Sequence, residues 1–570
     1  MASTPAQETW KDHWKCFVAC GVIVLSPFQY GVDFGLIGGL QAMVGFLKVF
    51  FLFPDFDECV CPNGTRQIYG YATPLVPSGW NIDTTRQQLI SSLMTLGAFI
   101  SSGTAGFVAT KLGRRHCLWL ACILCCISNV IMMATEDIGA LYAGRFLIGL
   151  ANGYFMTFSQ LYIQESSPAK YRGWFLTIFQ FFTSFGTLIG TIIDWATAER
   201  PDKSSYLIPL GMIYIVPLFL AVALFFIPES PRWLILTGKF EEGQKALAWL
   251  RPVGAPVLDE AAEIRRAIEA EKEMGAGVSF ADMFKNRVDL RRTTIAVCSV
   301  TLQAASGSMF IIAYKAYFLR MAKVNDPFAM SNVLSVMGIL AILFNSLIVV
   351  RFGRRRAILM IGLAVCGFFQ LIIAIIYDKL GRDHKAAANT LVALTCLYMM
   401  SYNGMISSYA WLAGGEIPSQ RLRSYTFGLA AAVGFFFAWL TTFTAPYFIN
   451  PQSLDWGPKY GYIWFPSCIV GVVWVFIFLP ETKGRTLEEI DEMVSFFFLF
   501  FLFFGGGIKK IWLTHSLFQF EKNLAARAFR KYVCVGHTAS APKGEEVEER
   551  PPSSSEKSAT NVQHSEVTKA

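Results

Sequence analysis

The sequence predicts an all-α membrane protein with twelve transmembrane helices arranged as two six-helix halves. Three observations indicate this fold class: an apolar composition, twelve separate apolar segments, and loop motifs that repeat between the halves. Of the 570 residues, 54% are hydrophobic and only 16% are charged, whereas about a quarter of the residues are charged in soluble proteins. This composition excludes an ordinary soluble enzyme. It also excludes a disordered chain, which needs low hydrophobicity and high net charge.

The apolar segments are each long enough to cross a membrane, which takes about 20 mainly apolar residues. Six precede a charged central stretch and six follow it, so we expect an N-terminal half at 1–227, a cytoplasmic helical linker at 228–292 and a C-terminal half at 293–493. The expected spans are 16–50, 88–110, 117–134, 138–163, 174–196, 206–227, 293–319, 329–350, 357–377, 388–413, 425–448 and 459–479.

Three loop motifs occur in the same order in both halves. Two halves built as parallel repeats place a substrate site between them near the bilayer midplane, so the repeats indicate a transporter. The paired motifs are Gly113-Arg114-Arg115 with Gly353-Arg354-Arg355, Glu165 and Arg172 with Glu416 and Arg423, and Pro228 to Arg232 with Pro480 to Arg485.

The basic residues are concentrated in short loops after the second, fourth, eighth and tenth spans. This bias predicts that these loops and both termini are cytoplasmic, in a multi-pass protein of the plasma membrane. The net charge of +8 is spread over these clusters, so it does not indicate a nucleic-acid partner. Asn63-Gly64-Thr65 is a glycosylation sequon in the first external loop, so we predict a glycoprotein modified at Asn63.

Taken together, the motifs resemble the sugar porter family of the major facilitator superfamily, in its fungal-type branch of hexose- and maltose-type permeases. The match extends from about residue 20 to 493 and includes Gly31 to Gly35 and Gly144 to Gly149. The resemblance implies the major facilitator fold and a secondary active transporter that imports a sugar or polyol by alternating access, as a proton symporter. It also implies a monomer in the lipid bilayer that works without a cofactor.

Two other functions remain open: a carrier of another hydroxylated metabolite, and a sugar sensor that does not transport. The sequence has no nucleotide-binding loop, metal-ligand cluster or catalytic-triad pattern, so it does not predict an enzyme.

Asp33 and Arg145 are charged residues inside predicted spans. Such charges are costly in a membrane and are therefore candidate functional residues. The resemblance implies that they form a proton-coupling pair. The alternatives are an ion pair that only holds helices together, or an aspartate that stays ionised in a uniporter.

A sugar site needs amide and hydroxyl groups in an otherwise apolar cavity, with an aromatic face against the sugar ring. The resemblance implies that Gln180, Gln303, Ser306, Tyr314 and Trp411 are the candidate substrate-binding residues, and Asn403 is a further candidate nearby. For each Gln, Asn or Tyr among them the alternative is an interhelical hydrogen bond.

Several family positions in the expected site have lost their polar side chains. The resemblance places an amide or a tyrosine where this chain has Ala304, Met309, Ala313 and Ala438. Either Asn403, Tyr402 and Thr442 substitute for these groups, or the substrate is not a simple hexose.

Lys315 follows Tyr314 in the seventh span. A lysine near a helix end commonly extends its ammonium to the membrane interface. The alternatives are that Lys315 binds an anionic group of the substrate or pairs with Asp194.

The charged loop motifs are interpreted as a cytoplasmic gate. The resemblance implies that salt bridges among them form in the outward-facing state and break when the protein opens inward. The expected gate residues are Arg115, Glu165, Arg172, Arg232, Arg355, Glu416 and Arg423.

Residues 494–519 interrupt the resemblance with a run of Phe and Leu from Phe496 to Phe504. This run is too short to span a bilayer, and without the segment Met493 would join Phe520 as in the family. We interpret 494–519 as a retained intron, with an interfacial insertion as the alternative. The tail 520–570 is expected to be cytoplasmic and largely disordered because it is rich in Ser, Pro, Glu and Lys.

Overall fold

The computed structural model describes residues 12–481, apart from 48–49, 53–64, 68–69, 73–78, 135–136, 201, 253, 274–279, 322–323, 325, 350–353, 381–384 and 420–421. The described residues belong to one compact unit, Met1–Ser495. The predictions for Asn63, for the segment 494–519 and for the tail 520–570 lie outside the described residues, as does the side chain of Arg172.

The N-terminal half contains six helical segments. The first consists of α1 (Trp14–Ile23) and α2 (Leu25–Leu40), and the sixth of α8 (Ser204–Met212) and α9 (Ile215–Ala223). The four between them are α4 (Thr84–Leu112), α5 (Arg114–Ala134), α6 (Ile138–Ser166) and α7 (Ala169–Thr197).

A short helix and two antiparallel strand pairs connect α2 to α4. The helix is α3 (Val44–Leu47), and the strand pairs are β1 (Phe50–Leu52) with β2 (Thr65–Gln67) and β3 (Gly70–Ala72) with β4 (Trp80–Ile82). In the first pair Phe50 lies opposite Gln67, and in the second Gly70 lies opposite Ile82.

The linker between the halves contains four helices. It forms α10 (Pro231–Leu236), α11 (Phe240–Leu250), α12 (Val257–Glu273) and α13 (Asp282–Lys285). Leu247 and Ile268 pack in a small apolar core of α10 to α12, separate from the main core.

The C-terminal half also contains six segments, three of which include a π-helical or 3₁₀ turn. They are α14 (Arg287–Ala305) with α15 (Ser308–Met321), α16 (Pro327–Phe344) with the π-helical η1 (Asn345–Val349), α18 (Arg355–Leu380), α19 (Lys385–Ser401) with the π-helical η2 (Tyr402–Ser407) and α20 (Ser408–Glu416), α21 (Arg423–Ile449), and the 3₁₀ turn η3 (Gly457–Tyr460) with α22 (Gly461–Phe478).

Within the described residues, nine helical segments are long and apolar enough to cross a membrane. The remaining three segments, α6, α7 and α19 to α20, lie among them, and α6 buries the polar residues Arg145, Asn152 and Gln160. Large apolar side chains such as Phe219 and Leu347 remain exposed on the outer faces of the helices. This inverted pattern, with polar groups inside and apolar groups outside, fits a bundle whose solvent is lipid.

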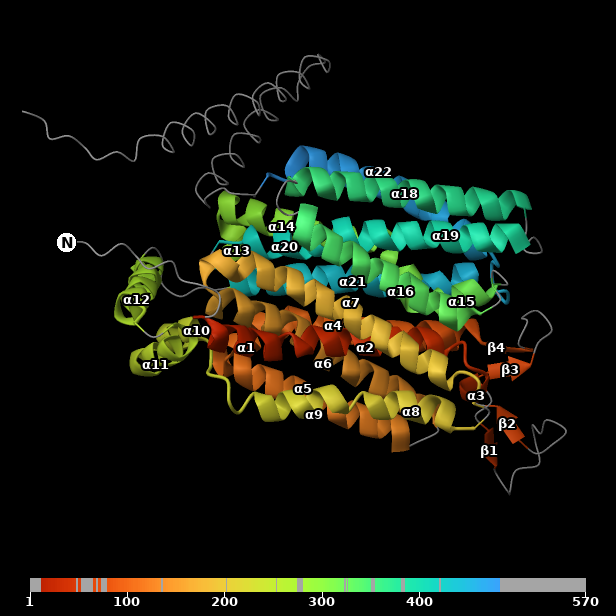
Figure 1. The fold of residues 1–570 in the computed structure, drawn as a ribbon, viewed down its shortest axis with the longest axis horizontal. Coiled ribbons are helices and arrows are strands. Elements are labelled where there is room, and N and C mark those ends of the chain that lie inside the picture. The colour runs from red at the N-terminus through yellow and green to blue at the C-terminus, as the bar shows by residue number, and fades with distance from the viewer. Residues whose placement is uncertain are drawn as a thin grey trace, which may run out of the picture. The chain divides into compact units, whose positions relative to one another are not determined.

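Figure 1 shows these helices lying side by side, with α10 to α13 at one end of the bundle and β1 to β4 at the other. The first of these is called the arginine-loop end, because Arg114 and Arg355 begin α5 and α18 there. The second is called the strand end.

The first span is shorter than the predicted segment 16–50, because α2 ends at Leu40. The N–H groups of Ala42 and Met43 bond to carbonyls three residues back rather than four, so the helix tightens into a turn. Gly39 allows the close approach that fixes this end, since a Cβ there would lie 1.9 Å from Asp194 Oδ2 on α7.

Candidate transport site

Asp33 and Arg145 form an ion pair in the interior of the N-terminal half. Arg145 Nη1 on α6 lies 3.0 Å from Asp33 Oδ1 on α2, and their side chains are 2% and 0% exposed. Arg145 also donates from Nε to the Ile90 carbonyl at 3.2 Å. The pair therefore links α2 and α6 and joins both to α4.

Asn152 completes this cluster by donating from Nδ2 to Asp33 Oδ2 at 2.8 Å. Both carboxylate oxygens of Asp33 thus accept a hydrogen bond. Sequence reasoning missed Asn152. The signal was available, because Asn152 lies seven residues after Arg145 and two turns of helix return to the same face.

A cavity lies between the two halves. Its walls come from α2, α6 and α7 of the N-terminal half and from α14, α15, α16, α19 to α20 and α21 of the C-terminal half. Tyr30 and Phe34, one turn before and one residue after Asp33, line it. Asp33 therefore lies on the same helix as two residues of the cavity wall, and between them in the chain.

Four of the six predicted substrate-binding residues line this cavity: Gln180, Gln303, Asn403 and Trp411. The Gln303 amide donates to the Ser407 carbonyl at 3.2 Å, which fixes its orientation. Asn403 Oδ1 accepts a bond of 3.4 Å from Ser184 Oγ across the two halves.

Trp411 supplies an aromatic wall of the kind that a sugar ring packs against. It lies between Phe427 and Phe435, with ring centroids 5.9 and 6.2 Å away. These neighbours hold the indole ring in place.

The other two predicted residues do not line the cavity. Ser306 Oγ donates to the Gln303 carbonyl at 2.6 Å, and Tyr314 Oη donates to the Thr442 carbonyl at 2.8 Å. Both side chains are fully buried and bonded to backbone. The prediction that they face a substrate does not match their position, because the helix breaks at Gly307 (φ +78°) and distorts at Tyr314 (φ −125°, ψ 17°).

Sequence reasoning also missed part of the cavity wall. Thr183, Ser184 and Thr187 on α7 line the cavity together with Gln180. They follow Gln180 by three, four and seven residues, which is the spacing of one helix face. Lys315 and Ser335 line the cavity as well.

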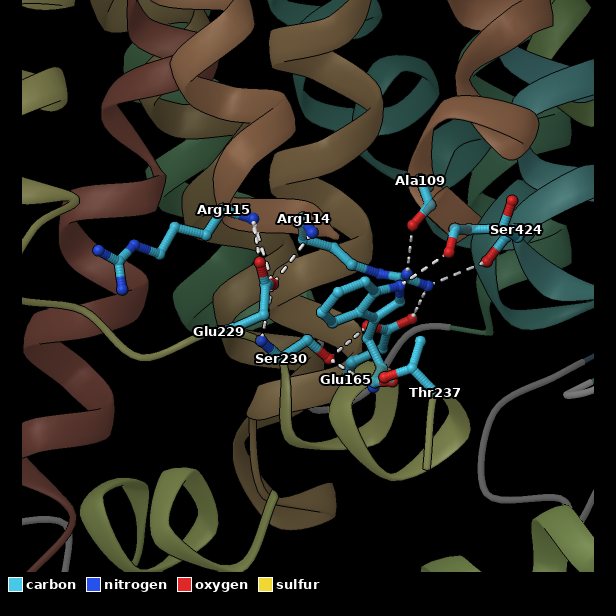
Figure 2. Close-up of polar contacts among 10 residues, drawn as sticks. Ala109, Arg114, Arg115, Glu165, Glu229, Ser230, Thr237 and Ser424 are labelled. Atoms are coloured by element: carbon cyan, nitrogen blue, oxygen red, sulfur yellow. Dashed lines mark hydrogen bonds and ion pairs between the residues drawn. The ribbon is translucent and has the colours of Figure 1, made fainter. Parts of the chain in front are cut away.

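At the arginine-loop end, Glu165 forms an ion pair with Arg114 and not with the predicted Arg115. Arg114 Nη2 lies 2.7 Å from Glu165 Oε1, and Ser230 Oγ donates to Glu165 Oε2 at 2.5 Å. Arg114 also donates to Ser424 Oγ of the C-terminal half at 3.4 Å. Figure 2 shows this cluster, with the Arg115 side chain pointing away from Glu165; its guanidinium lies 4.8 Å from the Trp119 ring centroid.

The C-terminal half has a related cluster, shifted by one residue relative to the sequence repeat. Arg355 bonds to Glu416, and the backbone N–H groups of Arg355 and Arg356 donate to Glu481. In the N-terminal half Glu229 accepts from the corresponding N–H groups of Arg114 and Arg115. Of the remaining predicted gate residues, Arg232 lies on α10, Arg423 begins α21, and Arg172 is in the first turns of α7.

The halves also touch at the strand end. Asn81 Nδ2 donates to Asn450 Oδ1 at 3.2 Å, and Asn450 Nδ2 donates to Gln87 Oε1 at 3.0 Å. Tyr317 Oη donates to Asn81 Oδ1 at 3.2 Å. Contacts between the halves therefore lie on both sides of the cavity.

The sequence model of a family described as "Sugar (and other) transporter" matches residues 19–494 of this chain. The chain belongs to this family of the major facilitator superfamily. It is accordingly a multi-pass membrane protein of a transporter family and not an enzyme.

Several members of the family are similar in sequence along most of this chain. A low-affinity glucose transporter of Kluyveromyces lactis is 25% identical over 86% of this chain and 84% of its own length. The high glucose sensor RGT2 of Saccharomyces cerevisiae is 26% identical over 84% of this chain. The matched region covers 60% of the length of RGT2.

The fold is that of the family as well. The proton:xylose symporter XylE, solved bound to 6-bromo-6-deoxy-D-glucose, matches with a TM-score of 0.66 and 18% identity. The match covers 84% of this chain and 99% of XylE. It confirms the predicted major facilitator architecture.

Proposed function

We propose that this family member imports a sugar or polyol across the plasma membrane by alternating access and couples the movement to a proton through Asp33 and Arg145. The observation that carries the proposal is a buried ion pair of 3.0 Å whose aspartate lies on α2 between Tyr30 and Phe34, two residues that line the cavity between the halves. The similarity to glucose transporters supports a sugar as the substrate.

The geometry suggests how binding and protonation are coupled. Asp33 accepts from Arg145 and from Asn152 while it is ionised. Protonation removes its charge and frees Arg145, so α2 and α6 are held less firmly. Tyr30 and Phe34 on α2 line the cavity. A substrate that contacts them therefore acts on α2, the helix that carries Asp33.

The test measures uptake of labelled sugars by the purified protein in liposomes with an inward proton gradient, with and without a protonophore. We expect the wild type to accumulate sugar above its outside concentration only while the gradient lasts. Asp33→Asn should lose this accumulation and keep sugar exchange across the membrane, because it cannot release a proton.

The control is Asp137→Asn at the exposed N-terminus of α6, where Asp137 Oδ2 accepts from the Ala140 N–H at 3.2 Å. That variant should accumulate sugar normally. Accumulation that persists in Asp33→Asn, or wild-type uptake that ignores the protonophore, would refute the coupling and leave facilitated diffusion.

A non-transporting sensor is the second candidate function, favoured by the similarity to RGT2. The same liposomes distinguish it, because a sensor binds sugar without moving any of the labelled compounds. A panel that includes polyols and other hydroxylated metabolites also tests whether the substrate is a simple hexose.

A further inference from the structure

Lys315 carries the single formal charge on the wall of the central cavity. The cavity-lining residues of the described chain include two glutamines, an asparagine, several hydroxyl groups and this one lysine, with no carboxylate. Lys315 is 2% exposed, so its ammonium does not extend to the membrane interface. Burying an ammonium group costs free energy because the charge loses its contact with water, so such a residue is a candidate functional residue.

The neighbours of Lys315 use only part of its hydrogen-bonding capacity. An ammonium has three N–H donors. Among the described residues one acceptor is in place, Ser335 Oγ at 2.7 Å, and that hydroxyl in turn donates to the Ser331 carbonyl at 3.0 Å. Two donors of Lys315 are therefore available to a molecule in the cavity.

Asp194 on α7 is the countercharge, but it does not occupy these donors. The Asp194 carboxylate and the Lys315 ammonium attract each other electrostatically. Asp194 nevertheless lies outside the cavity lining, against Gly39, and no side chain of the described residues donates a hydrogen bond to its oxygens. This interaction uses none of the remaining N–H donors of Lys315, so they can bond to an anion in the cavity.

The rest of the cavity wall is poor in the amides that suit a neutral hexose. Ala304, Met309 and Ala438 line it, at positions where an amide was expected from the family resemblance. The apolar wall strengthens an interaction with a charge because it excludes water. The cavity has thus lost neutral donors and acceptors and gained one cation.

We propose that Lys315 binds a carboxylate of the substrate, so that the preferred cargo is an acidic sugar such as a hexuronate. This inference rests on the proposed function and specifies its substrate class. Gln180, Gln303 and Trp411 bind the hydroxyl groups and ring face, and the Lys315 ammonium binds the carboxylate. A charge-assisted hydrogen bond to a buried lysine is roughly twice as strong as a neutral one.

The test compares three probes that differ at one carbon: D-glucuronate, its uncharged amide D-glucuronamide, and D-glucose. Binding to the purified full-length protein in liposomes is measured by calorimetry, and uptake is measured with labelled compounds. We expect the wild type to bind glucuronate at least tenfold more tightly than glucuronamide. This comparison requires no variant to fold.

Variants then assign the preference to the ammonium. Lys315→Gln should abolish the preference and leave glucuronamide affinity within about twofold, whereas Lys315→Arg should retain most of it. Asp194→Asn should keep or strengthen glucuronate binding, because it removes a competing anion. Lys239→Gln, at an exposed lysine in a linker ion pair with Glu242, is the matched control and should behave as wild type.

Equal wild-type affinity for glucuronate and glucuronamide would overturn the inference, as would a preference that survives in Lys315→Gln. If glucose and glucuronamide are transported and glucuronate is not, the inference fails while the proposed function stands. If none of the three probes binds or moves, the inference fails together with the proposal of a sugar substrate.

Discussion

Gln180 and Tyr314 were both predicted to bind substrate. Their surroundings differ, and the difference shows which side chain is available to a substrate and which one already bonds to the protein backbone. Gln180 lines the cavity, and no hydrogen bond from another described residue reaches its amide. Tyr314 is buried outside the cavity wall and donates to the Thr442 carbonyl. The amide of Gln180 is thus available to substrate, and the Tyr314 hydroxyl is already used.

Gln180→Ala should weaken sugar binding by about 2- to 10-fold, the equivalent of one hydrogen bond of about 0.5–1.5 kcal/mol. Its melting temperature in detergent should stay close to that of the wild type. Tyr314→Phe is the matched comparison and should do the reverse, with a lower melting temperature and affinity within about twofold. Calorimetric titration with the preferred sugar and a thermal melt of each variant measure both effects. Equal losses of affinity in the two variants would contradict this assignment.

At the scale of elements, the N-terminus of α5 depends on a carboxylate from the linker. Glu229 accepts from the backbone N–H groups of Arg114 and Arg115, which have no partner within the helix. Its negative charge also interacts favourably with the positive end of the dipole of α5. Gly113 makes the approach possible, with φ +84° and space for Glu229 where a Cβ would be.

Gly113→Ala should therefore lower the free energy of unfolding by about 1–3 kcal/mol, because its backbone (φ +84°, ψ 172°) lies in a region essentially restricted to glycine. The loss should be larger still because its Cβ would lie 2.6 Å from Glu229 Oε2. The control is Gly103→Ala within α4, whose Cβ would meet only Ala432 at 3.7 Å. That change should be neutral or stabilising, since Ala is the better helix former. Melting temperatures in detergent measure both. A Gly113→Ala protein that melts with the wild type would refute the steric requirement.

The sequence was most informative where a residue differs in chemistry from the residues around it, such as a charge within an apolar segment. Asp33 and Arg145 interrupt apolar runs, so the pair could be named before the fold was known. Lys315 and Tyr314 could not be placed, because the turn at Gly307 and the distortion at Tyr314 rotate the faces of α15 relative to α14. The family resemblance assigns Tyr314 to the substrate, and it leaves three alternatives open for Lys315: the membrane interface, an anionic group of the substrate, and Asp194. The pairing of Arg114 with Glu165 was missed for a similar reason, since the repeat in the sequence does not specify where α5 and α18 begin.

At the scale of the whole transporter, the two halves contact each other on both sides of the cavity. At the strand end the contacts include neutral hydrogen bonds among Asn81, Asn450, Gln87 and Tyr317, and one from the Arg320 guanidinium to the Ala42 carbonyl. At the arginine-loop end Arg114 reaches Ser424 of the other half while it is paired with Glu165. Hydrogen bonds from charged groups are the stronger kind, so we expect Arg114 to restrain opening of the arginine-loop end.

Arg114→Gln should shift the conformational equilibrium towards opening at the arginine-loop end. A hydrogen bond from a charged group contributes about 1.5–3 kcal/mol, so the open population should rise by about tenfold or more. Ser424→Ala should shift it in the same direction but less, because it keeps the pair with Glu165. Hydrogen exchange measured by mass spectrometry should show faster exchange at the end of α4 and the start of α21, with the strand end unchanged or better protected.

Arg265→Gln, in an exposed ion pair with Glu269 at 2.7 Å, is the control and should leave both ends as in the wild type. Faster exchange at both ends alike would indicate general destabilisation and would contradict a gate at Arg114.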